Sequence, residues 1–136
     1  MSEAVKKSRP QFRNIHITQL PNYRLPLAGL VSILHRISGA LMFVLLPFIL
    51  YLLELSITSE ISFNNMRAIV SHWFVKLIIL ALAWAYLHHF AAGIRHLFMD
   101  MHMALSKDGS RHSAASVLAI SLFLTLLVAL KLFGVF

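Results

Sequence analysis

The sequence contains no cysteine and little charge. Only 12% of its 136 residues are charged, about half the share in an ordinary soluble domain. Without cysteine the chain has no disulfide framework, no thiolate-bound iron–sulfur cluster and no cysteine-type zinc site. With 59% hydrophobic residues, so short a chain cannot bury its apolar side chains in one soluble core. The sequence therefore predicts an all-α integral membrane protein in which histidine binds any redox metal.

Three apolar segments are each long enough to cross a bilayer, which takes about 20 residues. Pro47 predicts a kink within the first, and a short polar connection at 54–65 follows it. Residues 1–25 are polar and lack the apolar run of a secretory signal, so we expect a cytoplasmic tail. We predict a single membrane-anchor domain, 1–136, whose three transmembrane helices cover about 27–53, 68–98 and 114–136.

Basic residues concentrate on one side of these spans. Five lie in the tail and three near the second connection, against Arg67 and Lys131 on the other side. Cytoplasmic segments carry the excess of lysine and arginine in membrane proteins. The N-terminus is therefore predicted to be cytoplasmic. The net charge of +7 is explained by topology, and we predict no nucleic-acid partner.

Two clusters of polar side chains interrupt the spans, where a charge costs roughly 2.5–3.5 kcal/mol at mid-membrane. At helical rise, Arg36 lies about 15 Å from the inner end of its span and His89 about 16 Å from the inner end of its own. Antiparallel helices would thus place both clusters in one layer of the membrane. The clusters are Ser32, His35 and Arg36 in the first span, and His88, His89, Arg95 and His96 in the second.

Such a layer suits two kinds of ligand. A b-type haem needs neutral imidazole ligands and cations near its propionates, and a quinone head group needs hydrogen-bond donors such as Ser32 and Arg36. Composition does not distinguish His88 from His89 as the haem ligand. Other interpretations of each residue stay open. His88 or His89 could form a hydrogen bond between helices, and Ser32 could bond its own backbone. Arg36 could extend to the membrane interface, and Arg95 could lie among lipid head groups.

Two motifs resemble a known family. Residues 32–39, Ser-Ile-Leu-His-Arg-Ile-Ser-Gly, resemble the S-x-x-H-R-x-S/T-G signature of the cytochrome b subunit of succinate dehydrogenase (complex II), its larger membrane anchor. Residues 89–100 are similar to that family's second signature, H-x-x-x-G-x-R-H-L-x-x-D. Arg9 and Pro10 match a third landmark, whereas Gln11 and His102 depart from the pattern. The resemblance covers nearly the whole chain.

The resemblance implies roles for single residues. His89 aligns with the axial ligand of the haem iron, and His35, Arg36 and Arg95 are assigned to contact with the cofactor. Ser32 and Arg36 would line the ubiquinone site. One haem b would be shared with a smaller second anchor subunit, and the helices of the two anchors would pack into one bundle.

The resemblance also implies an activity and partners. The chain would pass electrons from an iron–sulfur subunit to ubiquinone, while a flavoprotein subunit oxidises succinate. A bacterial inner membrane is favoured over a mitochondrial one, with membrane lipid around the spans. Two alternatives remain: an anchor of a fumarate reductase that uses menaquinone, and a haem-free structural membrane protein.

Overall fold

The computed structural model describes residues 16–135 and is all-helical over that range, which confirms the predicted fold class. The positions of Arg9, Pro10 and Gln11 lie outside the described residues. A short 3-10 helix precedes five α-helices. In chain order they are η1 (Ile17–Asn22), α1 (Leu27–Val44), α2 (Leu46–Thr58), α3 (Glu60–Ser71), α4 (Trp73–Asp100) and α5 (Lys107–Leu132).

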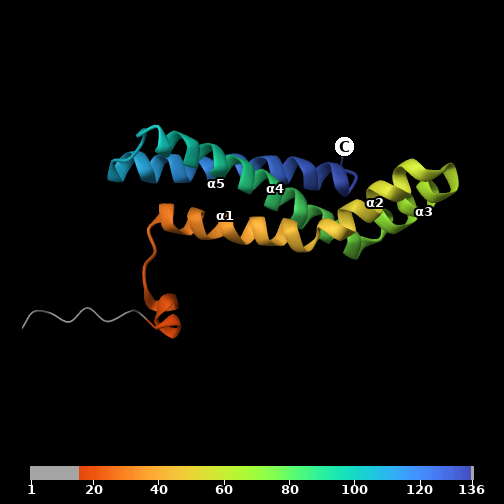
Figure 1. The fold of residues 1–136 in the computed structure, drawn as a ribbon, viewed down its shortest axis with the longest axis horizontal. Helices are drawn as coiled ribbons and strands as arrows, with labels where there is room; N and C mark the ends of the chain where they lie inside the picture. Colours follow the sequence, from red (N-terminus) through yellow and green to blue (C-terminus); the bar gives the residue numbers. More distant parts are fainter. Residues whose placement is uncertain (1–15, 136) are drawn as a thin grey trace, which may run out of the picture.

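Helices α1, α4 and α5 form a bundle in which each contacts the other two (Figure 1). These three are long and apolar enough to cross a membrane, which confirms the three predicted spans. The N-terminal ends of α1 and α5 and the C-terminal end of α4 lie at the same end of the bundle (Figure 1). This alternation brings the polar residues of α1 and α4 to a common level.

The first span is kinked, as Pro47 predicts. The helix breaks at Leu45 because Pro47 has no N–H to donate to the carbonyl of Phe43. The Leu45 N–H still donates to the carbonyl of Leu41 at 3.0 Å, and the Ile49 N–H to that of Leu45 at 3.1 Å. The break is therefore local, and α2 continues to Thr58, five residues beyond the predicted end of the span.

The polar connection at 54–65 is helical except at Ser59, where α2 and α3 form a hairpin that extends beyond the bundle (Figure 1). The Ser59 hydroxyl accepts from the N–H of Ser62 at 3.1 Å, and the Ser62 hydroxyl accepts from the N–H of Ser59 at 2.9 Å. This reciprocal capping lets polar residues begin a helix instead of a loop.

Capping also explains the other differences from the predicted spans. The predicted second span is divided at His72, whose Nδ1 accepts from the N–H of Phe74 at 3.3 Å and begins α4. Helix α5 begins at Lys107, seven residues before the predicted start, because the Ser106 hydroxyl accepts from the N–H of Gly109 at 3.1 Å. Hydropathy locates the apolar part of a helix, whereas these caps decide where the helix begins.

The core of the bundle is small and partly polar. Small side chains let helices approach closely in a membrane, and Val31 packs here against Ala92, Ala114 and Val117. Large apolar side chains mostly lie on the outside; Phe43, for example, is 77% exposed. The outer surface is therefore suited to lipid and to other subunits. The buried polar or charged side chains of the described residues are Ser38, His88, Arg95 and Ser121.

Candidate haem and quinone site

His89 lies on α4 where that helix meets α1. Its Nδ1 is 3.0 Å from the backbone carbonyl of His35 and 3.2 Å from the hydroxyl of Ser38, which itself donates to that carbonyl at 2.8 Å. A carbonyl only accepts, so Nδ1 of His89 carries the proton and donates. Nε2 then keeps its lone pair, and within residues 16–135 it is neither hydrogen-bonded nor enclosed. His89 thus presents a basic nitrogen that is open to a ligand.

Two further histidines gather around His89. The rings of His35 and His89 stack with centroids 4.0 Å apart and planes 22° apart. The ring of His96 lies 5.1 Å from that of His35, tilted by 43°. These contacts confirm that the clusters of the first and second spans meet at one depth.

Glycines make room for this arrangement. A Cβ at Gly39 would lie only 2.9 Å from Cε1 of His89, so α1 and the imidazole approach each other more closely than any other residue permits. At Gly93, one turn after His89, a Cβ would meet only Nε2 of His35, at 4.0 Å. The surface beside His89 is therefore open at Gly93 and closely packed at Gly39.

The packing at Gly39 makes a matched pair of substitutions informative. Gly39→Ala is expected to destabilise the protein by about 1–3 kcal/mol, because the new methyl group displaces the imidazole of His89. In Gly29→Ala the nearest atoms to the new Cβ are those of Pro26 at 3.6 Å, an ordinary contact. That change should be neutral or stabilise α1 by up to about 1 kcal/mol. Thermal unfolding of the purified protein compares the two, and equal stability would contradict the close approach.

His88 points away from His89 and into the bundle. It is fully buried, its Nδ1 is 3.3 Å from the hydroxyl of Ser121, and the ring of Trp84 stacks on it at 5.5 Å. Its Nε2 has no hydrogen-bond partner in the described chain, but it is enclosed. Of the two adjacent histidines, only His89 offers a nitrogen to a group outside the helices.

Ser32 and Arg36 lie one turn apart on α1. Arg36 is exposed and Ser32 half-buried. The hydroxyls of Ser38, Ser116 and Ser121 donate to carbonyls three or four residues earlier, but Ser32 makes no such bond. The alternative in which Ser32 bonds its own backbone is therefore not the observed one. Its hydroxyl and the Arg36 guanidinium are both available as donors.

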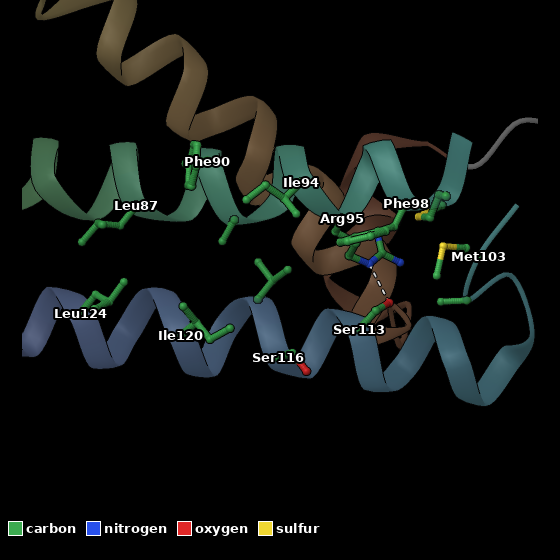
Figure 2. Close-up of a pocket in the computed structure, with 14 residues that line it drawn as sticks. Leu87, Phe90, Ile94, Arg95, Phe98, Met103, Ser113, Ser116, Ile120 and Leu124 are labelled. Atoms are coloured by element: carbon green, nitrogen blue, oxygen red, sulfur yellow. Dashed lines mark hydrogen bonds between the residues drawn. The ribbon is translucent and has the colours of Figure 1, made fainter. Parts of the chain in front are cut away.

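Arg95 is the predicted site residue that lies apart from the others. It is 5% exposed and faces α5, where its Nε donates to the hydroxyl of Ser113 at 3.0 Å (Figure 2). Its Nη2 donates to the hydroxyl of Ser110 at 3.1 Å. The structure thus brings together His35, His89 and His96, and places Arg95 at the contact between α4 and α5.

Sequence reasoning assigned no role to Ser38, Gly39 or Ser121. Ser38 and Gly39 lie within the first motif, three and four residues after His35, so helical periodicity could have placed both on the face of His35. Ser121 lies in an apolar span and gave no signal, because a serine there is ordinary until a buried partner is known.

The described residues do not supply a complete set of metal ligands. Within residues 16–135 no group of three or more histidine or acidic side chains is placed to hold a metal ion. A metal bound by Nε2 of His89 would need its remaining ligands from a cofactor and from another chain. A porphyrin together with a further ligand would meet that requirement, so the open nitrogen of His89 fits a haem.

Comparison with known proteins identifies the family of this chain. Residues 7–128 match the family model described as succinate dehydrogenase/fumarate reductase transmembrane subunit. The chain is 36% identical over 112 residues to the succinate dehydrogenase cytochrome b556 subunit of Coxiella burnetii, which covers 81% of this chain and 88% of that protein. It is 29% identical over 133 residues to the subunit of the same name from Paracoccus denitrificans, covering 98% of each. The chain therefore belongs to the succinate dehydrogenase/fumarate reductase transmembrane subunit family, as a membrane-anchor subunit of the succinate dehydrogenase cytochrome b type.

Proposed function

We propose that this subunit holds one haem b jointly with a smaller anchor subunit and contributes to a site where ubiquinone is reduced. The observation that carries the proposal is the hydrogen bond from Nδ1 of His89 to the carbonyl of His35, which leaves Nε2 open. The relatives are named cytochrome b556 subunits, and this open nitrogen belongs to the residue that the family motif aligns with a haem ligand.

In this proposal Nε2 of His89 would bind the haem iron from this chain. Haem b would supply a one-electron carrier in the membrane. A second ligand would come from the smaller anchor subunit. His35 stacks on His89, and Arg36 follows it on α1, so this part of α1 offers hydrogen-bond donors and positive charge to the propionates. Arg95 faces α5 and bonds to Ser113, so in this proposal it supports the cofactor site by holding α4 against α5.

Ser32 and Arg36 form this chain's part of the quinone site. A quinone carbonyl oxygen accepts hydrogen bonds, and the acceptor becomes stronger as the ring takes up electrons. The Ser32 hydroxyl is not bonded within the described chain, and the Arg36 guanidinium is exposed, so both can donate to a quinone at the surface of α1. Their role is to orient the head group and to stabilise its reduced forms.

The proposal also assigns partners and a location. A flavoprotein subunit oxidises succinate, and an iron–sulfur subunit carries the electrons to the layer of Ser32 and His89. The excess of basic residues on the N-terminal side supports a cytoplasmic position for that layer, and the membrane of this proposal is a bacterial inner membrane. Part of the apolar surface of the bundle then packs on the smaller anchor, and the rest faces lipid.

Purification of the tagged chain from its own membranes in a mild detergent tests the proposal. We expect two soluble redox subunits and one further small membrane protein to co-purify, with b-type absorbance that succinate reduces. A chain that purifies alone without b-type absorbance would instead be a haem-free structural protein. A complex that contains menaquinone and reduces fumarate faster than it oxidises succinate would be a fumarate reductase.

A further inference from the structure

An apolar groove of about 510 Å³ runs along the outside of the bundle between α4 and α5 (Figure 2). Leu87 and Ile94 line it from α4, and Ile120 and Leu124 line it from α5. The lining extends from Leu87 to Met99, about 18 Å at helical rise. The hydrocarbon of one leaflet is roughly half of a 30 Å core. The groove is thus as long as one leaflet is thick.

One end of the groove carries a positive charge. Arg95 lines the groove beside Ser113 at the end nearer Met103 (Figure 2). Its two hydrogen-bond partners are neutral hydroxyls, and no carboxylate of the described residues contacts it. Its third nitrogen, Nη1, has no hydrogen-bond partner in the part of the chain described, yet it is not enclosed. The carboxyls of Asp100 and Asp108 are exposed, and no ion pair among the described residues joins either of them to Arg95.

We propose that this groove is a binding site for an anionic phospholipid, with one acyl chain along the groove and the phosphate at Arg95. Arg95 lies five residues before the end of α4, about 8 Å at helical rise, which is near the depth of lipid head groups. A phosphate would supply the missing negative charge through charge-assisted hydrogen bonds with the guanidinium. An apolar groove with a cation toward one end, between Ile94 and Phe98, is complementary to a molecule that is apolar along its length and anionic near one end.

Other occupants fit this charge less well. A quinone head group is neutral and would leave the guanidinium uncompensated. A helix of another subunit would have to carry a carboxylate at the position that faces Arg95, besides an apolar face that fits the groove. An anionic lipid supplies the negative charge itself, because its phosphate lies at this depth in any bilayer.

The test uses the complex in which the chain is purified, with lipid removed and then added back. Native mass spectrometry counts the phosphatidylglycerol and phosphatidylcholine, of identical acyl chains, that each complex retains. We expect phosphatidylglycerol to be retained at least about tenfold better, as a charge-assisted contact predicts. In Arg95→Gln that preference should fall to near unity.

A matched pair of substitutions tests the apolar part. Ile120→Trp should fill the groove and lower retention of phosphatidylglycerol at least about tenfold, since Ile120 lines the groove and is 53% exposed. Leu122 is 56% exposed on the same helix but does not line the groove, so Leu122→Trp should leave retention unchanged. Comparing lipid retention by these two variants distinguishes the effect of filling the groove from a general effect of adding a bulky side chain to α5.

Three results would overturn the proposal. The first is equal retention of the two lipids by the original sequence. The second is normal retention of phosphatidylglycerol by Ile120→Trp. The third is a photo-reactive residue at position 120 that cross-links to another subunit or to quinone instead of lipid, since the groove would then be a protein contact or a quinone site.

Discussion

Replacing His89 by alanine is expected to remove most of the b-type absorbance from the purified complex while some assembly persists. Its imidazole is the one whose Nδ1 is held by the carbonyl of His35 and whose Nε2 is open. Loss of even an outer partner of a metal ligand commonly lowers affinity about 10- to 100-fold, so loss of the ligand should lower haem occupancy by at least about tenfold. Reduced-minus-oxidised difference spectra, normalised to the amount of complex, measure the change.

The neighbouring histidine supplies the matched control. In His88→Asn the amide can keep a hydrogen bond to Ser121 inside the bundle, so haem content should stay close to that of the original protein. His102→Ala, in the exposed segment after α4, should also leave it unchanged. Normal haem content and affinity in His89→Ala would refute the ligand role. If haem were lost in His88→Asn alone, the ligand would be His88, and α4 would have to turn in the complex.

Arg36→Ala is expected to lower quinone reductase activity about 10- to 100-fold, because a hydrogen bond to a charged group contributes about 1.5–3 kcal/mol. Ser32→Ala is expected to lower it about 2- to 10-fold, because a hydrogen bond between neutral groups contributes about 0.5–1.5 kcal/mol. Oxidation of succinate with a soluble dye as acceptor should remain normal, since that reaction bypasses the membrane site. The ratio of the two activities in the same preparation is the measurement. A lower ratio indicates a damaged quinone site, whereas an unchanged ratio with lower activities indicates less assembled complex.

The controls for this pair remove a serine hydroxyl and an arginine guanidinium from the α2–α3 hairpin, away from the proposed quinone site. The Ser56 hydroxyl donates to the carbonyl of Leu53 at 2.7 Å in α2, and Arg67 is exposed in α3. Ser56→Ala and Arg67→Ala should leave both activities unchanged. If Ser32→Ala and Arg36→Ala left both activities normal, these residues would have no part in quinone binding. An equal fall in both activities would point to impaired assembly instead.

The sequence by itself determined the membrane architecture. Hydropathy predicts three spans because lipid requires about 20 apolar residues for each crossing, and Pro47 predicts the kink because it has no N–H to donate. The meeting of the two polar clusters was predictable too. Helical rise sets the depth of His35 and His89 from the ends of their spans, and short connections make neighbouring spans antiparallel. Distances along a helix axis can be counted in residues.

Only the tertiary structure decided which way the side chains face. His88 and His89 are adjacent and of equal composition, but successive residues on a helix point about 100° apart. The rotation of α4 against α1 and α5 sends His88 to Ser121 and His89 to His35. The same rotation separates Arg95 from His35 of α1. That rotation is set by many small contacts among Val31, Ala92 and Val117, which no residue count along one helix contains.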